Sequence, residues 1–171
     1  KAFDLSLKQR ISEMSKGTKM KFSLLLAIAH RPKLLLLDEP TSGLDPVIRE
    51  EVLELLLDFM ADGERSILFS SHITSDIEKI ADIVTFIDHG EILLSEDKES
   101  LLDRYRRITL DGAATYALTT SLLFNCDQTR GGYVGYTNDY ETFAKKASGD
   151  WRAERLTLEE LFVLVSGREE T

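Results

Sequence analysis

The sequence predicts an α/β fold with a mainly parallel sheet, followed by a small α+β accessory domain. Over the first 98 residues, short apolar runs alternate with helical patterns, which is typical of strands joined by crossover helices. Beyond that point the sequence changes to alternating stretches, a Gly131-Gly132 turn and a final amphipathic helix. We therefore expect two domains, over residues 1–98 and 99–171.

Apolar runs and capping residues define the elements of the first domain. The first run, residues 33–37, is continuous and predicts a strand buried on both faces of a parallel sheet. Asp45 can cap a helix in which Pro46 takes the first position. His89-Gly90 predicts a hairpin turn. The remaining predicted elements are helices over 15–30, 46–62 and 74–81 and strands over 66–70, 83–88 and 91–95.

Composition narrows the class of protein. The chain has 171 residues and a net charge of −9, which argues against a nucleic-acid partner, because such partners are normally bound by basic surfaces. Cys126 is the only cysteine, so no intrachain disulfide can form, and we expect it to be a small buried hydrophobe. No apolar run approaches the ~20 residues that cross a bilayer, so a membrane role is expected to come through a partner.

The segment Leu34–Pro40 is the most informative, because an apolar strand ends there in two adjacent carboxylates. In open α/β sheets, ligands bind outside the carboxyl ends of the strands. At that place Asp38 can hold Mg²⁺ through water, and Glu39 can orient and deprotonate a water that attacks a γ-phosphate. An acidic turn after a strand is the simpler alternative for this segment alone.

Three further motifs accompany this segment. Residues 41–45 read Thr-Ser-Gly-Leu-Asp, and Ser70-Ser71-His72 ends the next strand. Met14-Ser15-Lys16-Gly17-Thr18 lies at a predicted helix start, where unpaired N–H groups favour phosphate.

Together these motifs resemble, in type and order, the second half of an ABC transporter nucleotide-binding domain, a P-loop NTPase. Leu34–Pro40 is similar to the Walker B motif with its catalytic glutamate, and residues 42–45 to the D-loop. His72 resembles the switch histidine, and residues 14–18 the signature motif. The resemblance covers residues 3–95, and residues 156–162 resemble the tail of many bacterial ABC exporter ATPases.

This resemblance implies an ATPase subunit that binds ATP and Mg²⁺ and energises export through a transmembrane permease. Two such subunits would pair head to tail on the cytoplasmic face of the membrane, as peripheral proteins. The residues it assigns are Glu39 and His72 for catalysis, Asp38 for the metal, and Ser15, Lys16, Gly17 and Asp45 for the nucleotide.

The sequence departs from the family pattern in two respects. Lys16 and Thr18 stand where the signature motif usually has glycine and glutamine. In addition, no Gly-x-x-x-x-Gly-Lys-Ser/Thr loop occurs in these residues, so the chain alone is predicted not to hydrolyse ATP.

Two other functions remain open from the sequence. One is a soluble ABC-type ATPase of DNA repair or translation, although the long coiled-coil insertions typical of that class are not visible here. The other is a non-catalytic regulatory protein, which the presence of both Glu39 and His72 disfavours. The transported substrate cannot be deduced from the sequence.

Overall fold

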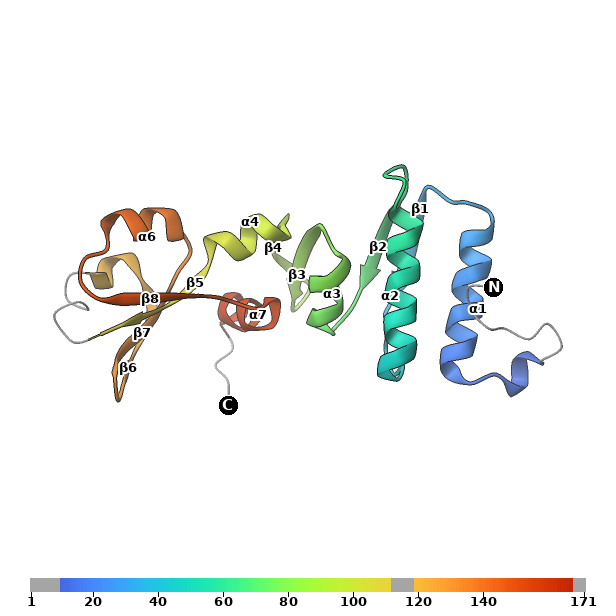
Figure 1. The fold of residues 1–171 in the computed structure, drawn as a ribbon, viewed down its shortest axis with the longest axis horizontal. Coiled ribbons are helices and arrows are strands. Elements are labelled where there is room, and N and C mark those ends of the chain that lie inside the picture. The colour runs from blue at the N-terminus through green and yellow to red at the C-terminus, as the bar shows by residue number, and fades with distance from the viewer. Residues whose placement is uncertain (1–9, 112–118, 168–171) are drawn as a thin grey trace. The chain divides into compact units, whose positions relative to one another are not determined.

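The computed structural model describes residues 10–111 and 119–167. The parts of the predicted domains over residues 1–9, 112–118 and 168–171 lie outside the described residues. The chain divides into two compact units, Lys1–Ile80 and Ala81–Thr171, whose elements are labelled in Figure 1. A compact unit in space need not coincide with a domain of the sequence, so the boundary at residue 98 stays a prediction.

The first unit alternates helices and strands as predicted. Asp45 caps α2, since its Oδ1 accepts a hydrogen bond from the N–H of Ile48 over 3.1 Å, and Pro46 takes the first helical position. Ser15 caps α1 in the same way, through the N–H of Thr18. The elements are η1 (Ile11–Glu13), α1 (Lys16–Ala29), β1 (Leu34–Asp38), α2 (Pro46–Met60), β2 (Ser66–Ser70) and α3 (Thr74–Ile80).

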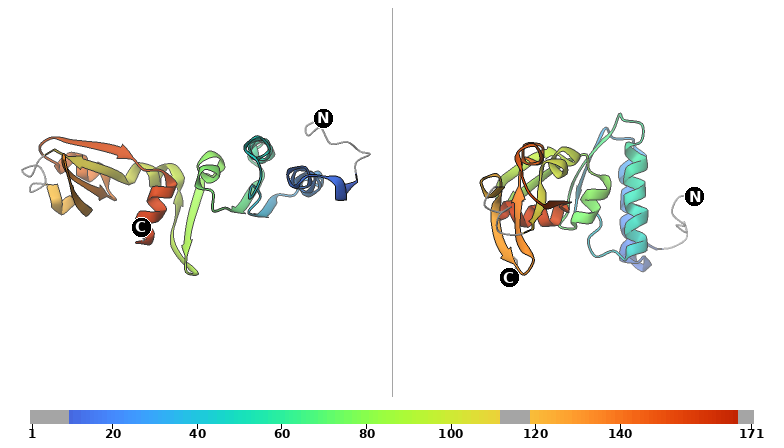
Figure 2. Two further views of the ribbon diagram at one scale, coloured as in Figure 1. Left: turned by 90° about the horizontal axis from the view of Figure 1, so that it is seen from below. Right: turned by 60° about the vertical axis from the view of Figure 1, so that its left-hand side comes forward.

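Strands β1 and β2 pair in parallel, which confirms the predicted arrangement for these two strands. Figure 2 shows α2 lying over one face of the pair. On that face the strands contribute Leu35, Leu37, Ile67 and Phe69 to a core that also contains side chains of α1, α2 and α3. The fully buried members from α2 are Val52 and Leu56, each 0% exposed, and Leu53, which is 1% exposed.

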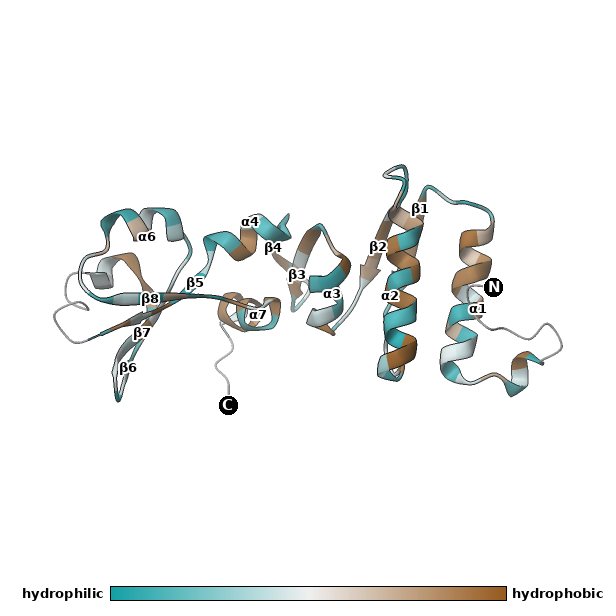
Figure 3. Cartoon of the chain, viewed as in Figure 1, coloured by the Kyte–Doolittle hydropathy of each residue, from teal (hydrophilic) through white to brown (hydrophobic). Residues whose placement is uncertain are grey.

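The opposite face of the β1–β2 pair differs from the prediction of a strand buried on both sides. Leu34, Leu36 and Leu68 are 55–67% exposed, because successive side chains of a strand alternate between faces and the helices cover only one of them. The middle of β2 is apolar in Figure 3. The continuous apolar run correctly predicted a strand of a parallel sheet. The prediction that both faces of this strand are buried was wrong for the residues that the structure describes.

The second unit begins with a hairpin and continues into a four-stranded antiparallel sheet. Strands β3 and β4 pair antiparallel around His89-Gly90, as predicted, and the larger sheet has the order β6-β7-β5-β8. Its elements are β3 (Ile83–Asp88), β4 (Glu91–Asp97), α4 (Lys98–Arg104), β5 (Arg106–Leu110), η2 (Thr120–Leu122), β6 (Phe124–Thr129), β7 (Gly132–Thr137), α6 (Tyr140–Lys146), β8 (Trp151–Arg155) and α7 (Leu158–Ser166).

The core of the four-stranded sheet forms around Phe143 of α6, which is 1% exposed and packs with Ile108 and Leu110 of β5. Trp151 is partly buried against this core, and its ring meets the Phe143 ring edge-on at 5.2 Å. Cys126, predicted to be buried, is only partly so. No residue of β6 is fully buried, so the apolar character of a cysteine did not decide its burial.

The final helix, α7, packs within the second unit. Thr157 and Glu160 form a capping box at its start. The Phe162 ring meets that of Phe86 on β3 edge-on, with 5.3 Å between the centroids. Helix α7 therefore packs against a strand that the sequence assigned to the first domain.

Candidate functional site

The carboxyl ends of β1 and β2 lie side by side. The parallel register pairs Asp38 with Ser70, the last residue of each strand. The chain then leaves each strand through a loop that begins with a polar residue, residues 39–45 after β1 and residues 71–73 after β2. This edge is where an open α/β sheet places its ligands.

Ser70 connects the two strand ends through its hydroxyl group. Its Oγ donates to Oδ1 of Asp38 over 2.5 Å and accepts from the backbone N–H of Glu39 over 3.1 Å. The same N–H also approaches the carbonyl oxygen of Ser70, at 3.2 Å. Sequence reasoning noted Ser70 only as the end of a strand, and the pairing register is the information it lacked.

Glu39 and His72 come together although they are 33 residues apart in the chain. Nδ1 of His72 lies 2.8 Å from Oε2 of Glu39, and the backbone N–H of His72 donates to Oε1 over 3.0 Å. The Glu39 side chain is 35% exposed and that of His72 69%. Glu39 and His72, which were predicted from separate motifs, are thus hydrogen-bonded to each other.

The backbone of Glu39 has a positive φ of 48°, in the left-handed region that non-glycine residues rarely adopt. Hydrogen bonds hold this conformation, since the N–H of Glu39 is bound to Ser70 and its carbonyl accepts from the N–H of Ser42. Strained backbone of this kind is found at functional sites, where surrounding contacts enforce it.

The turn after Glu39 leads into α2. Gly43 has a φ of 66°, and the N–H of Leu44 donates to the carbonyl of Thr41. Thr41 is fully buried, and its hydroxyl has no hydrogen-bond partner within residues 10–111 and 119–167. Asp45 caps α2, so the structure gives this predicted nucleotide residue a local structural contact.

Gly17 lies where α1 packs against α2. A Cβ on Gly17 would lie 2.8 Å from Cγ2 of Ile48, so only glycine fits without a shift of Ile48. A side chain at Gly43 would overlap the ammonium group of Lys16, which therefore lies over the turn after Glu39. The predicted signature segment thus contacts the predicted D-loop segment of its own chain.

The predicted residues therefore form two groups. Asp38, Glu39 and His72 meet at the strand ends, whereas no hydrogen bond or ion pair of the described residues joins Ser15, Lys16 or Gly17 to them. Within residues 10–111 and 119–167 no group of three or more His, Cys, Asp or Glu side chains is arranged to hold a metal. No helix in the same residues is long and apolar enough to cross a membrane.

This chain is similar in sequence to a known family and to several known proteins. The family described as "AAA domain, putative AbiEii toxin, Type IV TA system" matches residues 4–75. The ABC transporter ATP-binding protein YtrB of Bacillus subtilis is 36% identical over 108 residues, which are 63% of this chain and 37% of YtrB. The lantibiotic transport ATP-binding protein SrtF of Streptococcus pyogenes is 39% identical over 90 residues, 53% of this chain and 39% of SrtF. The chain thus spans about two-fifths of the length of these relatives.

A solved structure of an ABC transporter has a similar fold. It is described as an inward-facing conformation of a putative metal-chelate type ABC transporter, and it matches with a TM-score of 0.52 and 25% identity. The match covers 79% of this chain and 51% of that one. The chain is therefore similar to ABC transporter ATP-binding proteins over part of their nucleotide-binding domain, which has a P-loop NTPase fold.

Proposed function

We propose that this chain supplies the catalytic strand ends of an ATPase subunit that energises export through a membrane partner. The observation that carries the proposal is the pair formed by Glu39 and His72 at the carboxyl end of β1 and β2. An acid and a histidine in hydrogen-bond contact, at the ligand-binding edge of an α/β sheet, suit proton transfer and phosphate binding. Relatives named as transport ATP-binding proteins support the assignment to transport.

Glu39 is proposed to orient the attacking water and accept its proton. Its position directly after β1 and its half-buried carboxylate support this role. His72 is proposed to bond the γ-phosphate. Because Nδ1 of the ring is held by Glu39, Nε2 is the nitrogen that would meet a phosphate oxygen.

The donor atoms at the strand ends suit Mg²⁺. Asp38, Glu39 and the Ser70 hydroxyl offer only oxygen atoms, which this ion prefers. The described residues contain no cluster that would enclose a metal, and Mg²⁺ in nucleotide sites is usually bound by one or two carboxylates together with substrate phosphates. Asp38 would hold the ion, whose chemistry is to neutralise charge on the transferred phosphate.

Ser15, Lys16, Gly17 and Asp45 are proposed to act on the nucleotide of a second subunit in a head-to-tail dimer. Ser15 stands at the start of a 14-residue helix whose first turn contains no acidic residue, so its N–H groups and the Lys16 charge favour an anion. These groups make no hydrogen bond or ion pair with Glu39 or His72 among the described contacts. Hydrolysis is proposed for the whole subunit, peripheral on the cytoplasmic face of the membrane, and not for these 171 residues alone.

ATP turnover by the whole subunit, assembled with its membrane partner, tests the proposal. His72→Ala is expected to lower turnover by about a hundredfold, the contribution typical of a positioned acid–base or phosphate-binding group. His89→Ala is the matched control, because His89 is a histidine at a turn and is 85% exposed. Wild-type turnover in the His72 variant would contradict the assignment. Stimulation by nucleic acid, and none by the membrane partner, would favour the soluble class of ABC ATPase.

A further inference from the structure

Arg49 of α2 and Asp76 of α3 form a contact that the proposed chemistry does not use. Nε of Arg49 donates to Oδ1 of Asp76 over 2.5 Å, and Nη2 forms an ion pair with the same oxygen. Nη2 also donates to the hydroxyl of Ser75 over 2.6 Å. The Asp76 side chain is 1% exposed and that of Arg49 28%, so the guanidinium holds a carboxylate that is shielded from water.

The burial of Asp76 makes this pair a constraint on geometry. A buried ion pair adds little net stability, because removing both charges from water offsets their attraction, but loss of one partner leaves an uncompensated charge. Asp76 depends strongly on Arg49, since its other oxygen, Oδ2, is buried and has no hydrogen-bond partner among the described residues. The pair therefore ties helix α2 to helix α3 at a buried point.

Both residues of the pair lie close in sequence to the site. Arg49 is in the first turn of α2, and its N–H donates to the carbonyl of Asp45. Asp76 follows His72 by four residues, and its N–H donates to the carbonyl of Ile73. The His72 side chain is 69% exposed, so packing does not hold it. Its position depends on the loop of residues 71–73, which joins β2 to α3, and on the start of α3.

We propose that Arg49 is a positioning residue that acts through Asp76 to hold the loop carrying His72 opposite Glu39. The guanidinium fixes α3 against the first turn of α2, and α3 fixes the last residues of the loop. Because this inference rests on the proposed ATPase function, its test combines turnover with a measurement of the His72 ring itself.

The whole subunit, with its membrane partner, is compared as wild type, Arg49→Met, Arg49→Lys and Asp76→Asn. Lys79→Met is the matched control, because Lys79 and Glu50 form a more exposed ion pair between the same two helices. Arg49→Met is expected to lower kcat about tenfold or more through misplacement of a reacting group. The KM for ATP should stay within about threefold. Arg49→Lys should recover part of kcat, since it retains the charge but not the planar fork.

The second readout is the ¹⁵N NMR signal of the His72 ring, which reports its hydrogen bond to Glu39 and needs no turnover. It should move in the Arg49 and Asp76 variants toward its position in Glu39→Ala, and stay in place in Lys79→Met. If Arg49→Met does not fold, Arg49→Lys decides. Wild-type ring signals together with wild-type kcat in the Arg49→Lys and Asp76→Asn variants overturn the proposal. A wild-type subunit without ATP turnover overturns the ATPase function instead, and the ring signals then decide the positioning role.

Discussion

Both carboxylate oxygens of Glu39 are bound to His72, Oε1 to the backbone N–H at 3.0 Å and Oε2 to Nδ1 at 2.8 Å. The side chain of Glu39 thus contacts both the loop backbone after β2 and the imidazole ring. A substitution at Glu39 consequently alters the orientation of His72 as well as the acid itself. A loss of activity in a Glu39 variant can therefore come from the missing carboxylate or from a displaced His72 ring.

The positive φ of Glu39 predicts an unusual order of stabilities among its variants. Glu39→Gly should be more stable than Glu39→Ala by about 1 kcal/mol, because only glycine adopts a φ of 48° without a steric cost. Both variants lack the carboxylate, so its contacts with His72 cancel in the comparison. Urea denaturation measures the difference. An alanine variant as stable as the glycine variant would show that the backbone is not strained there.

Gly17 is predicted to be required for packing, whatever its role toward nucleotide. Gly17→Ala should destabilise the fold by about 1–3 kcal/mol, because the added Cβ would lie 2.8 Å from Cγ2 of Ile48. The same substitution in an Ile48→Ala background should cost distinctly less, since the conflicting methyl group is gone. A double-mutant cycle of thermal or urea midpoints checks this coupling, and additive effects would refute it.

Ser15 allows the action on a second subunit to be tested without disturbing the helix. Ser15→Asp should keep the helix cap, because aspartate caps as well as serine, but its negative charge should repel a phosphate. We expect ATP turnover to fall about tenfold or more, while the neutral control Ser15→Asn, also a good cap, stays within about threefold.

ATP binding by isolated Ser15→Asp subunits should equal that of wild type if the residue acts on the partner's nucleotide. Loss of binding in isolated subunits would place Ser15 in the site of its own chain. Equal turnover of the aspartate and asparagine variants would argue against any contact with phosphate.

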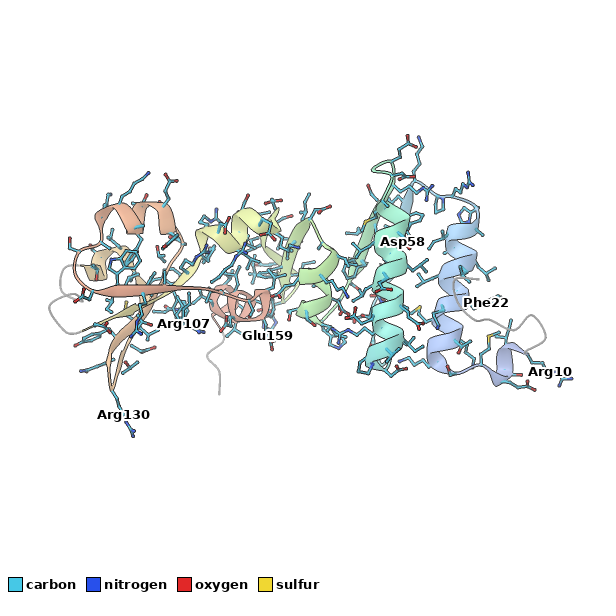
Figure 4. The ribbon with its side chains drawn as sticks, in the orientation of Figure 1. Arg10, Phe22, Asp58, Arg107, Arg130 and Glu159 are labelled. Atoms are coloured by element: carbon cyan, nitrogen blue, oxygen red, sulfur yellow. The ribbon has the colours of Figure 1, made fainter. Side chains whose placement is uncertain are left out.

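Glu160 gives the second unit a predicted dependence on pH. Burial is the largest single effect and raises the pKa of Glu160. The Thr157 N–H, the Arg107 guanidinium and the Thr157 hydroxyl each lower the pKa. Their combined effect exceeds that of burial, so the pKa of Glu160 lies below the ordinary 4.5. Arg107 is labelled on β5 in Figure 4, and its Nη2 donates to Glu160 over 2.6 Å. A pKa lowered in the folded state stabilises the fold above pH ~4.5, and this contribution is lost as the pH falls through the folded pKa.

Glu160→Gln tests this dependence, since glutamine preserves the capping box but cannot ionise. The variant should be less stable than wild type near neutral pH, and the difference should shrink below pH ~4.5. Urea denaturation at several pH values measures it. A difference that does not change with pH would show that the charge of Glu160 contributes nothing.

Local patterns in the sequence predicted most elements of the first unit and the residues at its strand ends. Asp45-Pro46 fixed the start of α2, and the apolar runs located β1 and β2 within a residue or two. Asp38, Glu39 and His72 could be predicted because each lies within two residues of the end of a strand, and parallel strands end at the same edge. The family resemblance added the roles of these residues, which stay predictions.

The contacts that sequence reasoning missed depend on the register of elements distant in the chain. Ser70 reaches Asp38 only because the two strands end in register, and nothing in the sequence around Arg49 indicates Asp76 as its partner, 27 residues later. Gly17 was interpreted through phosphate binding, whereas the structure shows its contact with Ile48. The burial of Leu34 and Leu36 was overestimated, because an apolar run does not reveal whether both faces of a strand are covered.

ATP turnover by the whole subunit with Glu39→Gln tests the central claim most directly. Glutamine keeps the size and one acceptor oxygen of the side chain but cannot accept the proton of an attacking water. We predict that turnover falls by about a hundredfold or more while ATP binding is unchanged, whereas Glu54→Gln, at an exposed position of α2, has no effect. Wild-type turnover in the Glu39→Gln subunit would contradict the assignment of Glu39 as the catalytic base.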